Sequence, residues 1–209
     1  MKFQGKKFGG DCPKFTILPV QVGGGFTLNA AQAAKFAEGW LIPTGTLANA
    51  DESTREAQVV VTGRVVAIDT SDAKKVTLQA DGAAAPPFCV NDYIGKDLAA
   101  TLANTPQVKA VELTNDGLVV TISKAISGLA VGDTLCEVVA DGSNVKLLAE
   151  PNSVLITDEE VKADGDTCID VTRNTGNGEC YARRVPPVPA TLMEGNILKG
   201  TKVAYTNTL

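Results

Sequence analysis

The clearest pattern along the chain is an alternation of apolar and polar residues that begins after Trp40. Alternation with period two, rich in Val and Thr, is typical of strands that bury one face. It is strongest in REAQVVVTGRVVAI (55–68), KKVTLQ (74–79) and LVVTIS (118–123). Asp-Gly pairs, which accept the positive φ angles of tight hairpin turns, lie at 81–82, 116–117, 141–142 and 164–165. The pattern therefore predicts a mainly β protein with an antiparallel sheet.

Two stretches of this region contain the same predicted strands, turns and loops in the same order. Residues 65–95 and 108–136 each contain an apolar strand, a polar turn, a Val-Thr-aliphatic strand, a longer loop and a Val-x-Asp-x-aliphatic element. An Asp before a strand can accept backbone N–H groups and fix the turn. These elements are Val90, Asp92 and Ile94 in the first stretch and Val131, Asp133 and Leu135 in the second. Two such units predict an antiparallel β-barrel or sandwich, and chance similarity between short β units is the alternative.

The N-terminal part has a different pattern. Residues 27–39 predict a short helix of roughly ten residues, capped by Thr27 or Asn29 and ended by Gly39. Before it, the apolar run CPKFTILPVQVGGGF (12–26) carries prolines at its edges and three glycines behind it. Prolines are unusual in a central strand, and the glycines predict a flexible joint. The run is therefore either an extended arm that binds a partner or the first strand of the protein's own sheet.

The C-terminal part predicts further β structure. A boundary segment at 148–167 leads to two runs, TCIDVT (167–172) and ECYARR (179–184), which suggest a hairpin. A proline-rich stretch follows and predicts an edge or linker, before a last strand at 201–205. The resulting division is an extended arm at 1–26, a short helix at 27–39, an antiparallel β domain at 40–149 and a C-terminal β segment at 150–209.

The amino-acid composition excludes several classes of function. The 209 residues contain no histidine, so the commonest general base, the Ser-His and Cys-His nucleophile pairs and most zinc sites are missing. The net charge of −5 argues against a nucleic-acid partner, although the first fourteen residues are basic.

Neither a membrane span nor a signal peptide is visible, which predicts synthesis in the cytoplasm and no membrane partner. Five widely spaced cysteines predict mostly free thiols, with Cys168 and Cys180 close enough on the expected hairpin to be considered as a pair.

Candidate chemistry is sparse. The three glycines at 23–25 lack the Lys-Ser/Thr of a phosphate loop. Carboxylates crowd residues 158–166, where a solvated turn is favoured over a calcium site because the EF-hand spacing is absent. A pair of carboxylates for glycoside cleavage remains open, since such pairs need not be close in sequence. The sequence thus predicts no catalytic residues, no metal and no cofactor.

The segment FAEGWLIPTGTLANADESTREA (36–57) resembles the opening of head-fibre and capsid-decoration proteins of tailed phages. The residues that carry this resemblance are Ile42, Pro43, Gly45, Thr46 and Asp51. The two Val-x-Asp elements and the C-terminal β segment with its proline-rich end are also similar, so that a loose likeness covers most of 13–209. The chain departs from the pattern at Val90-Asn91-Asp92, where Val-Gly-Asp is usual, and this leaves the type of the first turn open.

The resemblance implies a non-enzymatic structural protein of the virion, on the outer surface of the capsid, attached to the major capsid protein by its N-terminal part and homotrimeric. On this hypothesis the arm at 1–26 is the docking element. Its expected contact residues are Lys6, Lys7, Phe8, Lys14, Phe15, Ile17, Leu18, Val20 and Val22. The alternative function is a carbohydrate-binding or adhesion module that recognises host-surface glycans, although one Trp and three Tyr offer few rings for stacking on sugars.

Overall fold

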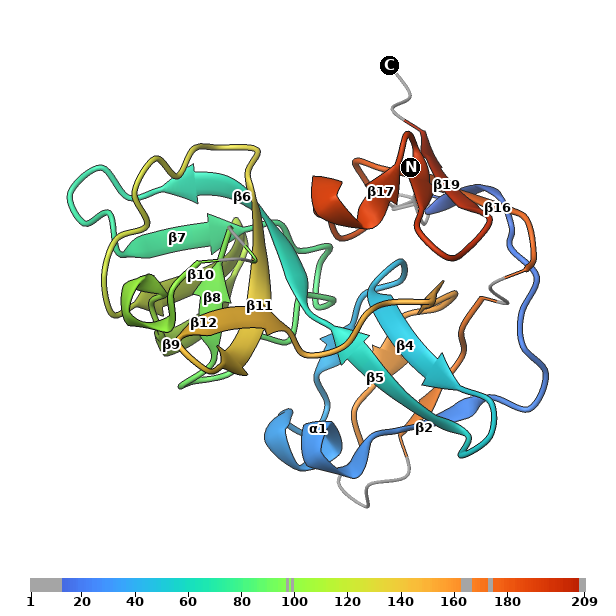
Figure 1. The fold of residues 1–209 in the computed structure, drawn as a ribbon. Coiled ribbons are helices and arrows are strands. Elements are labelled where there is room, and N and C mark those ends of the chain that lie inside the picture. The colour runs from blue at the N-terminus through green and yellow to red at the C-terminus, as the bar shows by residue number, and fades with distance from the viewer. Residues whose placement is uncertain (1–12, 97, 99, 163–166, 173–174, 207–209) are drawn as a thin grey trace, which may run out of the picture.

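The computed structural model describes residues 13–96, 98, 100–162, 167–172 and 175–206. Within these residues the protein is mainly β with one α-helix, as the sequence predicts. Figure 1 shows a barrel-like lobe on one side and two further sheets on the other. No helix in these ranges is long and apolar enough to cross a bilayer.

The first lobe is a barrel. Its strand order is β12-β11-β6-β7-β10-β9, and β8 pairs with the other side of β11. β8 also bonds the start of β9: the Ile94 N–H donates to the Pro106 carbonyl (3.0 Å) and the Val108 N–H to the Asp92 carbonyl (2.8 Å). These bonds close the sheet and leave few free edges. The strands are β6 (Thr62–Ile68), β7 (Lys75–Leu78), β8 (Tyr93–Gly95), β9 (Val108–Thr114), β10 (Gly117–Ile122), β11 (Thr134–Asp141) and β12 (Asn144–Leu147), with a 3-10 turn η1 (Leu102–Asn104).

The two stretches that share a sequence pattern also share turn geometry. In the turn at 89–92 the Asp92 carboxylate accepts the N–H of the first residue at 2.7 Å, and in the turn at 130–133 Asp133 does the same at 2.9 Å. Each Asp N–H also donates to the carbonyl of the first turn residue, at 3.1 Å in both turns. The carboxylates therefore fix the entry to β8 and to β11 in the same way.

The third residue of each turn has a positive φ, 76° at Asn91 and 95° at Gly132. Each donates its N–H to a neighbouring strand, Asn91 to the Val108 carbonyl at 2.9 Å and Gly132 to the Val65 carbonyl at 2.8 Å. Asn is one of the few non-glycine residues that tolerate this conformation. The departure from Val-Gly-Asp at 90–92 therefore leaves the turn unchanged.

Asp-Gly pairs form turns as expected, but not all of them join hairpins. The pair at 116–117 lies between β9 and β10, and the pair at 141–142 lies between β11 and β12. The pair at 81–82 forms an isolated tight turn closed by Asp81 and Ala84. The pair at 164–165 lies outside the described residues.

The second sheet has the order β13-β4-β5-β2-β15, and its strands β4 and β5 bury adjacent residues on both faces. Val59 of β5 packs into the core shared with the barrel, whereas Val60 packs toward the C-terminal sheet. Its strands are β2 (Phe26–Leu28), β4 (Leu47–Asp51), β5 (Glu56–Val60), β13 (Ser153–Val154) and β15 (Cys168–Ile169), with a small pair of β3 (Leu41–Ile42) and β14 (Glu159–Glu160) beside it.

Helix α1 (Ala30–Lys35) has six residues, fewer than the sequence predicts. The Asn29 side chain caps it by accepting the Ala31 N–H at 3.1 Å. The buried Gln32 side chain exchanges two hydrogen bonds of 2.8 Å with the Val59 backbone. These bonds fasten the helix to β5, so that tertiary contacts support a helix too short to be stable alone.

The third sheet has the order β1-β16-β19-β18-β17. The hairpin expected from 167–184 is wrong, because β15 pairs with β2 while β16 pairs with β1 and β19. Cys168 is consequently exposed, Cys180 is buried, and both thiols are free. The elements are β1 (Phe15–Ile17), β16 (Gly178–Tyr181), η2 (Ala190–Leu192), β17 (Met193–Glu194), β18 (Ile197–Leu198) and β19 (Val203–Thr206).

The sheets do not follow the division expected at 149/150. Strands β2, β3 and β4, from residues 26–51, pair with β15, β14 and β13, from residues 153–169, rather than with strands from 62–147, and the N-terminal β1 joins the C-terminal sheet. Local alternation does not encode such pairings between distant segments, because it depends only on which face of each strand is buried.

The turn at 43–46 contains three of the residues that carry the resemblance to phage proteins. It lies where the second sheet meets the C-terminal segment. The Thr46 hydroxyl donates to the Pro43 carbonyl at 2.6 Å, and Gly45 has a φ of 81°. A Cβ at Gly45 would lie 2.5 Å from Val185. Glycine is therefore required both by the backbone conformation and by the close approach of the C-terminal segment.

Candidate docking surface

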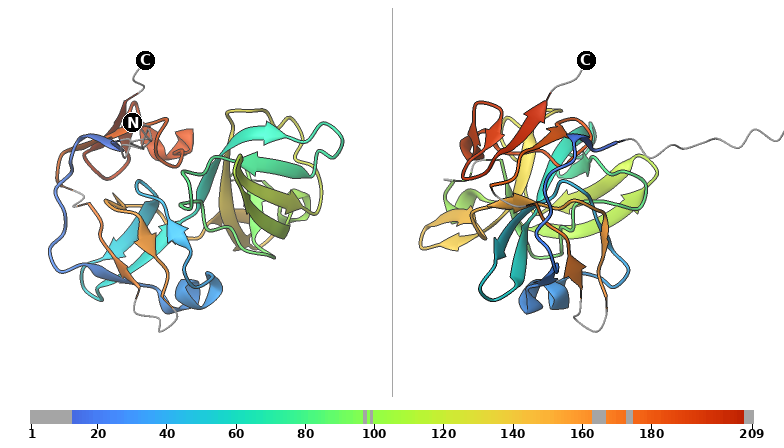
Figure 2. Two further views of the ribbon diagram at one scale, coloured as in Figure 1. Left: turned by 180° about the vertical axis from the view of Figure 1, so that it is seen from behind. Right: turned by 90° about the vertical axis from the view of Figure 1, so that its right-hand side faces the viewer.

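The N-terminal segment crosses the outside of the protein from the C-terminal sheet to β2 (Figure 2). It begins as β1, which pairs antiparallel with β16 in the registers Phe15 with Cys180 and Ile17 with Glu179. The Tyr181 N–H donates to the Lys14 carbonyl at 2.9 Å. Residues 13–22 are therefore held on the body as an edge strand and its extension, here named the arm strand.

One set of side chains attaches the arm strand to the body. Phe15 packs against the core of the C-terminal sheet, and Val22 packs against the core that continues into the barrel. Pro19 is buried, and a Cβ at Gly178 would lie only 2.4 Å from its ring. The expectation that Phe15 and Val22 meet a capsid thus needs correction, since both contact the protein's own core.

The remaining apolar side chains of the arm strand face outward. Ile17 is 56% exposed, Leu18 72% and Val20 50%. Single exposed aliphatic residues are ordinary on protein surfaces, but three within four residues form a local apolar patch. This patch, Ile17, Leu18 and Val20, is the part of the predicted docking set that remains available to a partner.

Of the basic residues in the predicted docking set, only Lys14 lies within the described residues. The Lys14 ammonium pairs with the Asp81 carboxylate, and its side chain is only 16% exposed. Lys14 therefore links the arm strand to the barrel lobe and is not a free contact. Lys6, Lys7 and Phe8 lie outside the described residues.

The glycines that follow the arm strand form a defined turn where the sequence predicts a flexible joint. The Arg55 guanidinium donates to the carbonyls of Gly23 (2.7 Å) and Gly25 (2.6 Å) and lies 4.4 Å from the centre of the Phe26 ring. A Cβ at Gly25 would lie 2.8 Å from the Cys168 sulfur. Arg55 therefore fixes where the chain enters β2, a role that its place at the start of an alternating run does not reveal.

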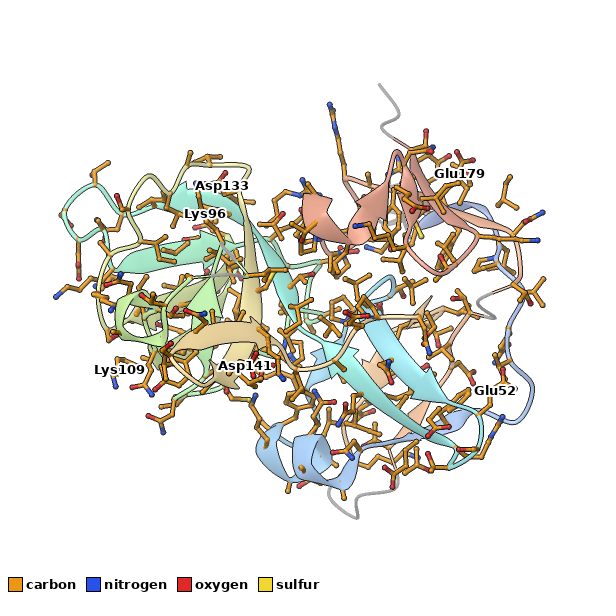
Figure 3. The ribbon with its side chains drawn as sticks, viewed as in Figure 1. Glu52, Lys96, Lys109, Asp133, Asp141 and Glu179 are labelled. Atoms are coloured by element: carbon orange, nitrogen blue, oxygen red, sulfur yellow. The ribbon has the colours of Figure 1, made fainter. Side chains whose placement is uncertain are left out.

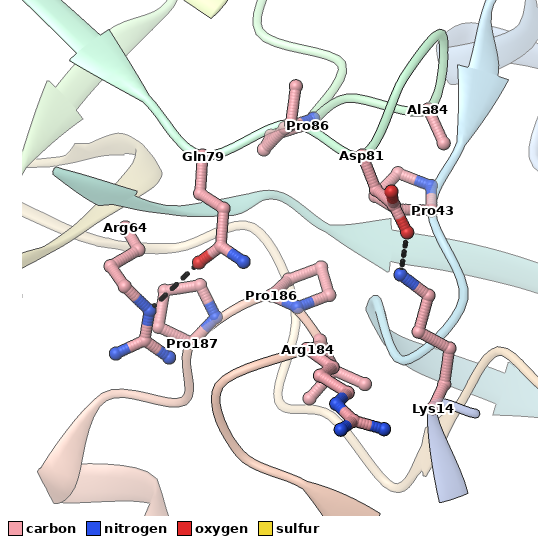
Figure 4. Close-up of a pocket in the computed structure, with 12 residues that line it drawn as sticks. Lys14, Pro43, Arg64, Gln79, Asp81, Ala84, Pro86, Arg184, Pro186 and Pro187 are labelled. Carbon is pink, nitrogen blue, oxygen red and sulfur yellow. Dashed lines mark hydrogen bonds and ion pairs between the residues drawn. The ribbon is translucent and has the colours of Figure 1, made fainter. Parts of the chain in front are cut away.

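A small cleft lies beside the start of the arm strand, where it meets the barrel lobe and the C-terminal segment (Figure 4). Its free volume of about 20 Å³ holds roughly one water molecule. Arg64 donates to Gln79 at 3.1 Å and to the Ala182 carbonyl at 2.7 Å, and Arg184 donates to the Pro13 carbonyl at 3.1 Å. Burial, and then the charge of Arg183, lowers the pKa of Arg64. The cleft is a junction that joins three parts of the protein, and it is too small for a ligand.

The acidic segment at 158–166 has structural roles where it is described. The Asp158 carboxylate accepts the N–H and the hydroxyl of Thr44 at 2.6 and 2.7 Å. The Glu159 carboxylate accepts the Thr157 hydroxyl at 2.5 Å, and burial raises its pKa. Among the residues with described positions, no group of three or more Cys, Asp or Glu side chains could hold a metal ion.

The three tyrosine rings are buried, half-buried or covered by another side chain, and the Trp40 indole is held by a hydrogen bond. The Trp40 indole donates to the Ala85 carbonyl at 2.9 Å, Tyr205 is buried, and the Arg184 guanidinium lies 4.5 Å from the Tyr181 ring. Tyr93 is half-buried against the outer cluster of the barrel. The carbohydrate alternative therefore gains no specific stacking platform from the three tyrosine rings.

In comparisons with protein-family models, curated proteins and solved structures, nothing matched this chain.

Proposed function

We propose that the protein is a non-enzymatic structural protein of a tailed-phage virion, a head fibre or capsid decoration protein on the outside of the head. Its partner is the major capsid protein, and the arm strand provides the contact. The observation that carries the proposal is the patch of Ile17, Leu18 and Val20, exposed on a segment that the rest of the protein holds in place.

The patch would contribute to binding through the burial of its apolar side chains. Burying an aliphatic side chain fully stabilises a complex by about 1.5–3 kcal/mol before ordering costs. Ordering costs are reduced here because β16, Gly178 and Val171 already position the arm strand. Several copies of the arm in one oligomer would add avidity without new contacts.

Deletion of the whole N-terminal segment is a poor test, because it removes a strand from the C-terminal sheet. A sharper test places a charge in the patch by Val20→Asp. Its matched control is Val131→Asp, since Val131 is an exposed valine (65%) on the barrel lobe. Both variants and the wild type are mixed with heads purified from the phage that carries this gene, after the gene is deleted, and bound protein is measured by co-sedimentation.

We expect Val20→Asp to weaken binding by about 10- to 100-fold, the equivalent of one lost buried valine, and Val131→Asp to bind as the wild type. Equal binding by all three proteins would rule out the patch as the contact. Failure of the wild type to bind the heads would overturn the proposed function itself.

A further inference from the structure

A second hollow lies between the segment that follows α1 and the barrel lobe. Its cavity volume is about 210 Å³. The exposed residues Ala37 and Val90 lie at its rim, so it opens to solvent. Its apolar lining is formed by Phe36, Trp40, Pro87, Phe88, Val90 and Val111.

The lining is fixed by its own contacts. Phe36 and Phe88 are buried, with 5% and 3% exposure, and belong to the main core. The hydrogen bond from the Trp40 indole to the Ala85 carbonyl (2.9 Å) orients the third ring. Three of the chain's ten aromatic residues, six Phe, three Tyr and one Trp, therefore line one preformed hollow. A rigid apolar wall with an open mouth is the usual form of a small-molecule site.

The size indicates one ring. An apolar cavity of about 150 Å³ is large enough to bind benzene. The hollow near Trp40, at about 210 Å³, can take a six-membered ring with a small substituent.

The polar groups nearby indicate the charge of the ligand. Lys35 lines the hollow, but its ammonium is bound to the Asp92 carboxylate at 2.8 Å and the Glu137 carboxylate at 2.5 Å. The second Glu137 oxygen is buried without a hydrogen-bond partner. Two carboxylates thus face a single ammonium, and a further anion would meet repulsion and an uncompensated desolvation cost.

The thiol of Cys89, the other polar group of the lining, is not activated as a nucleophile. Burial raises its pKa to about 11, so the thiol stays protonated at neutral pH. The group contributes surface to the hollow but no nucleophile.

We propose that this hollow is a binding site for a small, uncharged molecule with a single aromatic or aliphatic ring. The site is independent of the capsid contact, since none of the arm-strand residues lines it.

Trp40 is the only tryptophan of the chain, so its emission reports on the hollow directly. The probes are cyclohexanol and benzyl alcohol, each compared with its anionic counterpart, cyclohexanecarboxylate or benzoate, at neutral pH. We expect a saturable shift of Trp40 emission with the two alcohols. The two anions should bind at least about tenfold more weakly, because Lys35, the one cationic residue of the lining, is already paired with Asp92 and Glu137.

A variant that fills the mouth separates binding in the hollow from a general solvent effect. Ala37→Phe places a ring at the rim, whereas Ala34→Phe places it on α1 at an exposed alanine that does not line the hollow. Ala37→Phe should lose at least about nine-tenths of the affinity for both alcohols, and Ala34→Phe should keep it.

A linear, non-saturating response of the wild type to both alcohols would overturn the proposal. An equal affinity of the Ala37→Phe and Ala34→Phe variants, or equal binding of alcohols and anions, would overturn it as well. Thermal unfolding of each variant shows whether it is folded. If Ala37→Phe does not fold, Val90→Phe at the other side of the rim replaces it with the same expected result.

Discussion

The ammonium of Lys35 joins helix α1 to the barrel, and it does so among groups that are mostly buried. Asp92 and Glu137 have side-chain exposures of only 8% and 7%. Burial acts to lower the pKa of Lys35, but the charges and hydrogen bonds of Glu137 and Asp92 outweigh it and leave the pKa raised. For Glu137 the balance is opposite, because burial raises its pKa despite the attraction of Lys35.

This arrangement predicts a pH dependence that Glu137→Gln should remove. A carboxyl group with a raised pKa binds its proton more tightly in the folded state, so its contribution to stability is greatest below its unfolded pKa and falls as pH rises toward the folded pKa. We therefore expect the unfolding free energy of the wild type, relative to Glu137→Gln, to be highest below the ordinary pKa of a glutamate, about 4.3, and to decrease as pH rises above it. Urea unfolding at several pH values measures this difference, and an increase with pH would contradict the assignment.

Little of this residue-level detail has a local signal in the sequence. The sequence predicts Asp92 and Asp133 as turn-fixing residues, because an Asp before a strand has a local partner within three residues. The pairing of Lys35 with Asp92, and of Lys14 with Asp81, joins positions 57 and 67 residues apart, and charge patterning gives no signal at such separations. Lys96 and Asp133 pair in a similar way at 3.0 Å at the rim of the barrel (Figure 3).

At the scale of elements, the two equivalent turns at 89–92 and 130–133 allow a direct comparison. The first uses Asn91 at φ 76° and the second uses Gly132 at φ 95°. A Cβ at Gly132 would meet no atom within 4 Å. Substitution there therefore tests backbone conformation without a packing effect.

We expect Gly132→Ala to lower the unfolding free energy by about 1–2 kcal/mol, the cost of a left-handed conformation for an ordinary residue. Gly132→Asn should cost less, because the equivalent turn already uses asparagine and its side chain can bond locally. Chemical denaturation of the two variants measures the difference. Equal costs for Ala and Asn, or no cost for either, would show that the positive φ is not required.

The elements that sequence reasoning predicted well are those with local signals. The mainly β class, the Asn29 cap and the hairpins at 116–117 and 141–142 follow from alternation, capping chemistry and turn residues. The hairpin at 167–184 was wrong because two adjacent β runs pair elsewhere, with β2 and with β1. Partner choice depends on which buried faces match across the whole molecule, and neither run carries that information locally.

At the scale of the whole molecule, the arm strand is part of the fold and a candidate contact at once. Its attachment depends on the absence of a side chain at residue 178, where Pro19 lies against the backbone. Its sequence, with prolines at the edges of an apolar run, left open both a free arm and a first strand. In the structure the segment is an edge strand of the protein's own sheet, and Ile17, Leu18 and Val20 face solvent.

Gly178→Ala should therefore displace the arm strand. The new methyl group would lie about 2.4 Å from the Pro19 ring, and such crowding costs about 1–3 kcal/mol. We expect faster proteolytic cleavage within residues 13–22, measured by limited proteolysis and mass spectrometry. Gly23→Ala, where a Cβ meets nothing within 4 Å, is the control and should be cleaved as the wild type. Unchanged cleavage of Gly178→Ala would contradict the close approach.

The oligomeric state remains a prediction from the phage resemblance. A homotrimer requires a mass about three times the 21.7 kDa of one chain, which light scattering of the purified protein measures. A mass near that of a single chain would contradict the trimer and would leave the arm strand without avidity.

The most direct test of the capsid contact is a site-specific photocrosslink on assembled heads. A photoreactive residue replaces Leu18 in the patch or, as a control, Val66 on the barrel, where the native side chain is 38% exposed. We expect a crosslink from position 18 to the major capsid protein and none from position 66. A crosslink from position 66 alone, or none from position 18 on heads that carry the protein, would contradict docking through Ile17, Leu18 and Val20.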